Sequence, residues 1–429
     1  MSRSIYTLLY ACLLPVMLMR LWWRGRTNPG YRQRIFERFG RIPHRPQPGG
    51  LWLHAVSMGE TLASVPLVNA FIKQHPDVPV IITTTTPTGS EQVKKQFGSR
   101  VYHMYMPYDL PWFLERLIRS IRPSLLVIME TEMWPNLLAC CEKNHIPVVL
   151  ANARLSEKSA AGYAKLTKIT PAMMSSFTKI AAQYESDGER FVTLGLDPKK
   201  LAVIGSIKFD AHVPPGSEEK GMILRKEWGE SRTVLALASS HPGEDERVLA
   251  LYPALSKVCP DLLLLLVPRH PERFEGVTNA AHNQHLRVHR RNQGPATSAV
   301  QVYVADTMGE MFTLLAAADL VLMGGSLEKH GGHNPIEPAA LGKPTLIGPN
   351  YLNFSTIVDN LVAEDALAVV DNVDNLEAAL SNWLTSTEQR IAMGNKAKHV
   401  VDANKGSVER LLALINKHLD ARKRARSVY

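Results

Sequence analysis

Short apolar runs alternate along the chain with segments whose apolar residues recur at helical spacing. Runs of this kind, separated by helices, are typical of βαβ units and predict a mostly parallel sheet. The runs fall into two series. The first comprises residues 51–56, 78–85, 101–106, 124–130, 146–152, 179–183 and 201–205, and the second comprises residues 233–239, 262–270, 300–306, 320–326, 343–349 and 366–371.

A stretch rich in proline, glycine and charge separates the two series. Residues 213–221, VPPGSEEKG, have no apolar periodicity and are typical of a linker. A chain of 429 residues is also long for one domain. We therefore expect an α/β protein with two doubly wound, Rossmann-like domains, 29–212 and 222–395, that face a cleft. A C-terminal helix with a basic tail is expected at 396–429.

The N-terminal residues 1–28 combine an apolar run with a basic flank. The run from Ile5 to Met19 is uncharged, but it is shorter than the roughly 20 residues of a spanning helix, and Pro15 interrupts it. It predicts a membrane anchor, either a marginal span or a helix in the interface; the alternative is a buried N-terminal helix. Eight arginines lie between Arg20 and Arg45. By the positive-inside rule, this basic collar keeps the body of the protein in the cytoplasm.

Composition narrows the class of protein. The net charge of +9 is concentrated at the two ends, which favours an anionic surface, and the adjacent apolar run favours a membrane over nucleic acid. Four cysteines without a Cys-x-x-Cys pair indicate a reducing compartment. His282, His285 and His289 lack a cysteine or carboxylate at ligand spacing, so we do not predict a metal site there.

Several nucleotide-binding motifs are absent from the sequence. No G-x-G-x-x-G follows a predicted strand and no G-x-x-x-x-G-K-[ST] occurs, which argues against a nicotinamide oxidoreductase and a P-loop NTPase. There is also no Asp-x-Asp triplet, the pattern by which many enzymes hold a sugar nucleotide through a metal ion. A site that works without metal or other cofactor is favoured.

Ligands of doubly wound sheets bind at the carboxyl ends of the strands, so we searched the residues that follow each run. Glu60 ends the stretch Ser57-Met58-Gly59-Glu60, which has the spacing of a capping box, and capping alone explains it. The same spacing recurs at Thr88/Glu91, Ser186/Glu189 and Thr307/Glu310. The alternative is that Glu60 is a catalyst, since Gly59 lets a ligand approach a strand end.

Two further carboxylates follow the fourth run, in METEMWPN. Glu130 lies where an apolar strand should end buried, which favours a functional role. Glu132 is open to a structural explanation, because Thr131 can cap a helix with Glu132 in its first turn.

In the second series, Pro268 and Arg269 end a very apolar run, and a fixed cation there suits a phosphate or carboxylate, or an ion pair with a neighbouring helix. Gly309, Glu310 and Met311 are expected to open a helix with free backbone N–H groups. The stretch 323–349 contains several glycines followed by Asn334, Pro335, Ile336 and Glu337. There we expect Asn334 to cap a helix and Glu337 to meet ribose hydroxyls, while the glycines let a ligand approach the backbone.

These motifs together resemble the 3-deoxy-D-manno-octulosonic acid (Kdo) transferases of lipopolysaccharide synthesis. The matching segments run along nearly the whole chain: RLWWRGR, SMGETLA, TTTTPTGSE, MPYDLP, METEMWPN, ANARLS, GSIKFD, VPRHPERF, DTMGEM, GGSLEKHGGHNPIEPAA and GPNYLNF. The resemblance implies a GT-B glycosyltransferase that moves Kdo from CMP-Kdo to lipid IVA. It also implies attachment to the cytoplasmic face of the inner membrane, with no role for nucleic acid.

The resemblance also implies roles for individual residues. Glu60 corresponds to the general base, and Glu130 and Lys208 to residues that support the transition state. CMP contacts correspond to Pro268, Arg269, Gly309, Glu310, Met311, Asn334, Pro335, Ile336 and Glu337. The rival hypotheses are a GT-B transferase that uses another nucleotide sugar and a non-catalytic protein that binds anionic lipid through the arginine collar.

Overall fold

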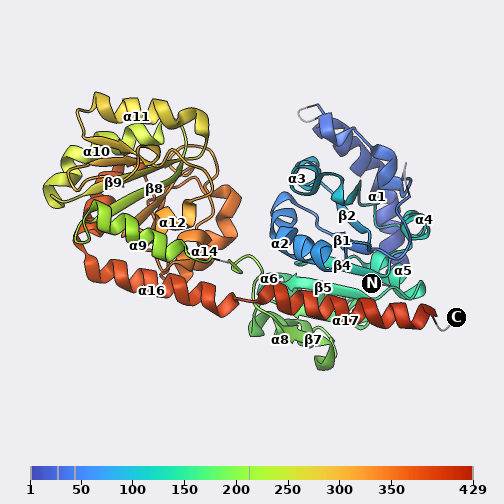
Figure 1. Ribbon diagram of the computed structural model, residues 1–429. Helices are drawn as coiled ribbons and strands as arrows, with labels where there is room; N and C mark the ends of the chain where they lie inside the picture. The colour runs from blue at the N-terminus through green and yellow to red at the C-terminus, as the bar shows by residue number, and fades with distance from the viewer. Residues whose placement is uncertain (1, 27–28, 43–44, 212, 428–429) are drawn as a thin grey trace. The chain divides into compact units, whose positions relative to one another are not determined.

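The computed structural model describes residues 2–26, 29–42, 45–211 and 213–427, and it divides the chain into two compact units (Figure 1). Unit 1 contains Met1–Ile207 and Gly406–Tyr429, and unit 2 contains Lys208–Lys405. Among the described residues, each unit has a seven-stranded sheet with parallel strand pairs, covered by helices on both faces. The prediction of two Rossmann-like, doubly wound units is confirmed.

The sheet of unit 1 has the strand order β3-β2-β1-β4-β5-β6-β7. The order reverses between β1 and β4, so the crevice beyond the carboxyl ends of these two strands is the switch point where doubly wound sheets bind ligands. The strands are β1 Leu51–His54, β2 Val80–Thr84, β3 Tyr102–Tyr105, β4 Leu125–Met129, β5 Val148–Ala153, β6 Lys179–Ala182 and β7 Leu201–Val203.

Two hydrophobic layers enclose this sheet. One face packs against α2 Met58–Gln74, α3 Pro87–Phe97 and the C-terminal helix α17 Ser407–Ser427. The other face packs against α4 Pro111–Ile121, α5 Pro135–Lys143, α6 Glu157–Ala164, α7 Ile169–Ser176 and α8 Glu185–Thr193. The central strands β1, β2, β4 and β5 are therefore buried along their whole length.

The sheet of unit 2 has the order β10-β11-β9-β8-β12-β13-β14, with its switch point between β8 and β12. Its strands are β8 Val234–Ser240, β9 Leu263–Pro268, β10 Val288–Arg290, β11 Val302–Val304, β12 Leu320–Met323, β13 Thr345–Ile347 and β14 Ala368–Val369. One face packs against α9 Ser217–Trp228, α12 Met311–Ala316, α13 Ile336–Ala340, α14 Ser355–Ala363 and α16 Thr387–Asn404. The other face packs against α10 Glu244–Val258, α11 Phe274–Asn283 and α15 Leu376–Thr385.

The chain returns to unit 1 at its C-terminal end, where α17 (red in Figure 1) completes the first core. Leu411, Leu412 and Ile415 are buried against the sheet, and Nε2 of His75, the residue after α2, lies 2.8 Å from Oδ1 of Asn416. The expected segment 396–429 therefore begins within α16 of unit 2 and ends as part of unit 1.

The linker expected at 213–221 is shorter than the sequence suggested. Helix α9 begins at Ser217, directly after Gly216, whose φ of 79° turns the chain. Glu218 and Glu219 lie in the first turn of α9, where carboxylates stabilise a helix. The charge of this segment therefore belongs to a helix start, and only the residues before Gly216 remain outside regular structure.

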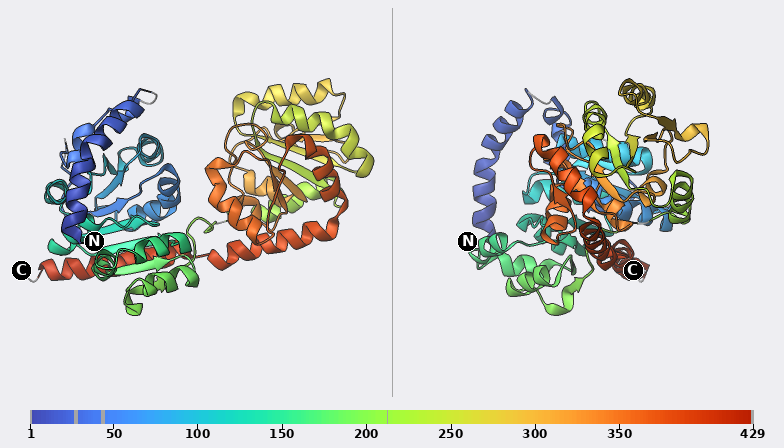
Figure 2. Two further views of the ribbon diagram at one scale, coloured as in Figure 1. Left: turned by 180° about the vertical axis from the view of Figure 1, so that it is seen from behind. Right: turned by 90° about the vertical axis from the view of Figure 1, so that its left-hand side faces the viewer.

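The N-terminal helix α1, Arg3–Arg24, lies on the surface of unit 1 and is drawn in blue in Figures 1 and 2. It continues through Pro15, so the proline does not end it. None of its residues is buried, which makes the alternative of a buried N-terminal helix wrong. By length and composition α1 is apolar enough to cross a membrane.

Polar contacts hold both ends of α1. Near its C-terminal end the Arg32 guanidinium donates to the carbonyl of Trp22 at 2.9 Å. The Tyr6 hydroxyl donates to Oδ2 of Asp109 at 2.9 Å, and the Thr7 hydroxyl donates to Oδ1 of Asn136 at 3.0 Å. The other side of the helix exposes large apolar residues along its whole length: Ile5, Leu8, Leu9, Leu13, Val16, Met19, Trp22 and Trp23. One side of α1 is thus docked on unit 1, and the other exposes an apolar stripe.

Candidate active site

Glu60 lies in the first turn of α2, which follows the end of β1 at the switch point of unit 1. The Ser57 hydroxyl accepts from the backbone N–H of Glu60 and donates to its Oε1 at 2.9 Å. The backbone N–H of Val56 donates to Oε2 at 2.8 Å. The capping role expected from the sequence is confirmed, and the same contacts fix the direction of the carboxylate.

The Glu60 carboxylate lies in an environment that disfavours its charge. Glu60 is only 9% exposed. Burial raises the pKa of Glu60 to about 7, and the negative charges of Glu130 and Glu132 also raise it. The hydrogen bonds from Val56 and Ser57 lower the pKa but do not cancel this effect. A carboxylate with a pKa near neutral is suited to take and return protons near neutral pH.

Glu130 directly follows β4, the strand beside β1 at the switch point. Its backbone has a φ of 57°, a left-handed conformation that is uncommon for a residue with a side chain. Asn152 near the end of β5 has the same feature, with a φ of 53°. Such strain is concentrated at functional sites, because the surrounding structure must hold it in place. Here the two left-handed residues lie at the carboxyl ends of two neighbouring strands, β4 and β5.

Glu132 does not occupy the position expected from capping. Helix α5 begins at Pro135 and is preceded by Trp134, so Thr131 caps no helix. Instead the indole Nε1 of Trp134 donates to Oε2 of Glu132 at 2.8 Å. Pro135 at the first helical position shifts the helix start past Thr131. The Glu132 carboxylate is therefore held by the tryptophan and adds negative charge near Glu60.

Lys208 is partly exposed and is the first residue of unit 2. The preceding Ile207 is buried in the core of unit 1, where its backbone N–H donates to Oδ1 of Asn152 at 3.1 Å. Phe209 is buried in the core of unit 2. The short segment that carries Lys208 is thus anchored on both sides of the lysine.

In unit 2, Arg269 follows Pro268 at the end of β9, and its backbone N–H donates to the carbonyl of Ser240. The guanidinium is exposed and makes no ion pair with a described residue. Burial raises the pKa of Glu337, while Arg269 and a hydrogen bond with Asn334 lower it, so these side chains lie close together. The site brings together these residues from the ends of β9 and of the loop after β12.

Helix α13 begins close to the position the sequence predicted. Oδ1 of Asn334 accepts from the backbone N–H of Ile336 at 3.2 Å, Pro335 precedes the first helical residue, and Glu337 lies in the first turn. Pro335 and Ile336 are buried and Asn334 is partly exposed. The stretch therefore presents Asn334 and Glu337 to the same sheet edge as Arg269.

Gly309, Glu310 and Met311 lie after β11, and helix α12 begins at Met311 as expected. The Glu310 carboxylate is engaged by its neighbours: the Arg291 guanidinium donates to it at 3.1 Å and the Thr307 hydroxyl at 2.5 Å. These bonds, chiefly the one from Arg291, lower the pKa of Glu310. Gly309 has a φ of 83° and open space where a side chain would lie, so it leaves room beside this turn.

The glycines after β12 make close contacts with neighbouring segments, a packing role that the sequence did not predict; the approach of a ligand to them stays a prediction. A Cβ at Gly324 would lie 2.5 Å from the carbonyl oxygen of Ser239, and one at Gly325 would lie 2.9 Å from the His333 ring. At Gly331 and Gly332 it would meet side-chain or backbone atoms of residues 350–353. The loop lies too close to the end of β8, to His333 and to residues 350–353 for side chains at these positions.

Two features of this edge were missed from the sequence. His241 follows β8, and its ring contacts those of His270, His330 and His333. The fully buried Glu244 accepts hydrogen bonds from four backbone N–H groups, those of His241, Gly325, Ser326 and Leu327. The signal available in the sequence was the stretch SSHPGEDE, which follows a strand. His241 and His333 are 92 residues apart, however, and become neighbours only when the chain folds. In the described part of the chain, no group of three or more His, Cys, Asp or Glu could hold a metal ion.

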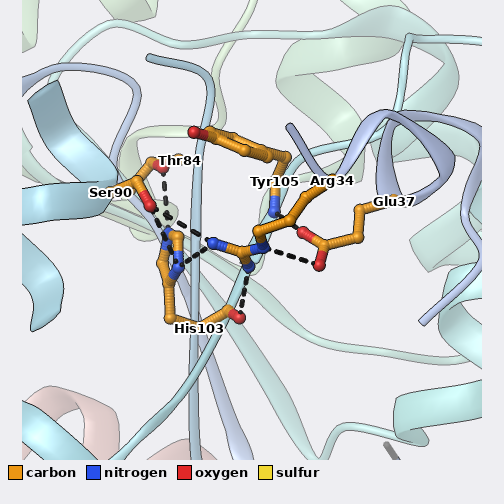
Figure 3. A network of polar contacts seen from close by, with 6 residues as sticks. All are labelled: Arg34, Glu37, Thr84, Ser90, His103 and Tyr105. Atoms are coloured by element: carbon orange, nitrogen blue, oxygen red, sulfur yellow. Dashed lines mark hydrogen bonds and ion pairs between the residues drawn. The ribbon is translucent and has the colours of Figure 1, made fainter. Parts of the chain in front are cut away.

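Part of the arginine collar is structural (Figure 3). The Arg34 guanidinium donates to Glu37 at 2.8 Å, to the carbonyl of His103 at 2.8 Å and to Nδ1 of the same histidine at 3.1 Å. Arg38 is only 4% exposed, and its guanidinium lies 4.3 Å from the ring centroid of Tyr105. These two arginines therefore hold residues 34–39 against β3 and do not belong to a surface that meets lipid.

Comparisons with known proteins identify the family of this chain. The family described as 3-Deoxy-D-manno-octulosonic-acid transferase (kdotransferase) matches residues 33–211. The 3-deoxy-D-manno-octulosonic acid transferase of Haemophilus influenzae is 40% identical over 424 residues, 98% of this chain and 99% of that relative.

Two solved structures are also similar. The C-terminal CMP-Kdo binding domain of WaaA from Acinetobacter baumannii is 34% identical, with a TM-score of 0.39, and covers 42% of this chain and 97% of its own. MurG of Acinetobacter baumannii is 11% identical, with a TM-score of 0.52 over 86% of this chain and 100% of its own, which is a likeness of fold alone. The chain therefore belongs to the 3-deoxy-D-manno-octulosonic acid transferase family and has the GT-B fold of two Rossmann-like units.

Proposed function

We propose that this enzyme transfers Kdo from CMP-Kdo to a hydroxyl group of lipid IVA, with inversion at the sugar carbon and with Glu60 as the general base. The observation that carries the proposal is the state of Glu60. It is a buried carboxylate at a switch point, oriented by two hydrogen bonds, with a pKa raised to about 7. Family membership supports Kdo as the group transferred.

The base must remove a proton that an alcohol does not release by itself. As the acceptor oxygen bonds to the anomeric carbon of Kdo, its proton passes to Glu60, and the bond from that carbon to CMP breaks. Each Glu60 oxygen accepts one hydrogen bond from the protein and retains a lone pair for the acceptor hydroxyl. A pKa near 7 keeps about half of Glu60 ionised at pH 7, ready to act.

Charge in the transition state assigns roles to the other residues. The sugar carbon becomes oxocarbenium-like, and the carboxylates of Glu60, Glu130 and Glu132 supply negative potential. CMP leaves with negative charge on its phosphate, which suits the exposed guanidinium of Arg269 and the ammonium of Lys208. Because these side chains supply the cations, we propose that no metal ion takes part.

The donor residues belong to unit 2. Arg269 is the fixed cation for the phosphate, and the nearby Glu337 and Asn334 offer hydrogen-bond partners for ribose or base. Glu310 also lies at this sheet edge, but its carboxylate is held by Arg291 and Thr307. We therefore assign the Gly309–Met311 turn to donor binding through its backbone and the open space beside Gly309.

The acceptor is a lipid, and α1 supports a membrane-bound enzyme. The docked first turns of α1 and the exposed apolar stripe favour a helix that lies in the interface at the cytoplasmic face of the inner membrane, not one that spans it. Trp22 and Trp23 at its end are residues that prefer this interface. Arg24 and Arg26, on the C-terminal side of the helix, suit anionic headgroups.

The test is transfer of label from CMP-Kdo to lipid IVA in detergent, with UDP-GlcNAc as a competing donor. We expect transfer from CMP-Kdo alone, and excess UDP-GlcNAc should neither react nor compete. Transfer from UDP-GlcNAc would favour a GT-B enzyme for another nucleotide sugar. If neither donor reacts and the protein still binds anionic vesicles, the non-catalytic alternative stands.

A further inference from the structure

The imidazole cluster of unit 2 lies where a doubly wound sheet receives its ligand. His241 follows β8, and His330 and His333 lie in the loop after β12, so they flank the switch point of the second sheet. His270 follows the neighbouring strand β9, directly after Arg269. Four titratable rings from three strand ends thus gather beside Arg269, whose guanidinium makes no ion pair with a described residue.

The geometry within the cluster is specific. Nε2 of His241 lies 2.9 Å from Nε2 of His333, and the two rings are inclined by only 9°. Their centroids are 5.1 Å apart, close to the greatest separation that this nitrogen distance allows. The rings therefore lie nearly in one plane and share one proton in an N–H···N bond. His330 stacks on the face of His241 at 4.2 Å.

The loop that carries His333 is rigidly held, so the pair is preorganised. Glu244 binds the backbone N–H of His241 and those of Gly325, Ser326 and Leu327, and thereby joins the two strand ends. The His333 ring fills the space beside Gly325, where a Cβ would be only 2.9 Å away. Burial of a carboxylate is unfavourable unless hydrogen bonds satisfy it, and here four N–H donors do so. These bonds hold the two strand ends together and thereby fix the distance between the two imidazoles.

The surroundings of the pair keep it neutral until negative charge arrives. Burial and the neighbouring His241, Arg269, His270 and His330 lower the pKa of His333 to about 4. Burial and nearby cations, including Arg273, also lower the pKa of His241, against the opposing effect of Glu244. Arg273 is itself paired with Asp245 at 2.7 Å, which leaves Arg269 as the cation available to a ligand.

We propose that the His241–His333 pair and Arg269 form an anion subsite that takes up one proton from solvent when the anionic group of a nucleotide donor binds. The inference rests on the proposed role of unit 2 in donor binding. The added proton converts the pair into an imidazolium–imidazole hydrogen bond. The imidazolium and Arg269 repel each other, but both attract the bound anion, and these attractions offset that repulsion. The chemistry recognised is an oxyanion, either the phosphate of CMP or the carboxylate of Kdo.

The experiment measures proton uptake by calorimetry of CMP binding in buffers of different ionisation enthalpy. At pH 7 we expect the wild-type protein to take up about 0.5–1 proton for each CMP bound, with an affinity that falls up to tenfold per pH unit as pH rises. Cytidine should bind without uptake, since it lacks the phosphate. Free Kdo in place of CMP tests the carboxylate as the source: uptake with Kdo and none with CMP would assign the subsite to the carboxylate.

Two variants separate the pair from other titrating groups. His333→Gln keeps a polar side chain but does not titrate, so uptake should fall close to zero and the pH dependence should flatten. His289→Gln, on β10 and away from the cluster, should keep the wild-type uptake. The ionisation of free CMP is the same in every titration, so a difference in uptake between the proteins arises in the bound complex. If His333→Gln does not fold, the proton uptake of His241→Gln and of the wild-type protein tests the proposal instead.

The outcomes of these measurements distinguish the anion subsite from the proposed transferase function. If the wild-type protein transfers Kdo and binds CMP but takes up no proton with either CMP or Kdo, the subsite is wrong and the transferase stands. If His333→Gln takes up the same number of protons as the wild type, the pair is only a packing element and the inference is overturned.

Discussion

Replacing Glu60 by glutamine should make unit 1 more stable at alkaline pH while it abolishes transfer. Burial and neighbouring carboxylates raise the pKa of Glu60 from 4.5 to about 7. Ionising this side chain therefore costs the folded protein about 3 kcal/mol more than it costs the unfolded chain. Glutamine is neutral and keeps an oxygen that accepts from the Val56 N–H. Part of the gain is lost because its amide nitrogen replaces an oxygen that accepts from Ser57, so we expect a net stabilisation of about 1–3 kcal/mol.

The sign of the effect depends on pH in a defined way. A carboxyl group whose folded-state pKa is raised loses stability as pH rises from its unfolded value toward its folded value. The advantage of Glu60→Gln should therefore be small at pH 4.5, grow up to pH 7 and stay constant above pH 8. A matched control is Glu115→Gln on α4. Its ion pair with Lys143, at 2.6 Å, lowers the pKa of Glu115, so this variant should lose stability at neutral pH.

The assay must report unit 1 alone, because two units need not unfold together. Hydrogen exchange of peptides from β1 and β4 in increasing urea gives the free energy of opening of that sheet. If Glu60→Gln opens more easily than the wild type at pH 8.5, or if the difference does not change with pH, the raised pKa and the argument from it are wrong.

Three other predictions follow from single features of the structure. Arg269→Ala should weaken CMP binding at least tenfold in calorimetry, whereas Arg247→Ala, an exposed arginine on α10, should leave it unchanged. Replacing Trp22 and Trp23 by serine should lower binding to anionic vesicles in a flotation assay without changing the far-UV circular dichroism; undiminished flotation would contradict the interfacial position of α1. Arg38→Ala should lower the unfolding free energy of unit 1 by about 2–3 kcal/mol in urea, since it removes a buried guanidinium that contacts Tyr105 and Thr85; a change within 0.5 kcal/mol, about the size of a surface substitution, would show that Arg38 belongs to the surface collar.

The sequence was sufficient for the fold because parallel strands leave a strong local signal. Runs of apolar residues marked the strands, and the residues that end them, including Glu60, Glu130 and Arg269, lie at the carboxyl edges of the sheets. The capping pattern was less reliable. Ser57 caps α2, but α3 is capped by Thr86 and α8 follows Tyr184, so the Ser/Thr-x-x-Glu patterns at Thr88/Glu91 and Ser186/Glu189 lie inside helices.

What the sequence could not reveal depends on residues that are distant along the chain. The histidine cluster forms only when the ends of β8 and β12 become neighbours, and Glu244 gains its role from four backbone groups in two loops. The glycines after β12 suggested a ligand, and only the structure shows their close contacts with Ser239, His333 and residues 350–353. Arg34 and Arg38 suggested a lipid surface, and only their contacts with His103 and Tyr105 show a structural role.

The central claim is that Glu60 removes the acceptor proton, and the rate of Kdo transfer by Glu60→Gln tests it most directly. The rate from labelled CMP-Kdo to lipid IVA should fall at least about a hundredfold relative to wild type, with CMP affinity unchanged. The wild-type rate should decrease about tenfold per pH unit below pH 7 as Glu60 becomes protonated. A Glu60→Gln enzyme that transfers Kdo at the wild-type rate would contradict the account.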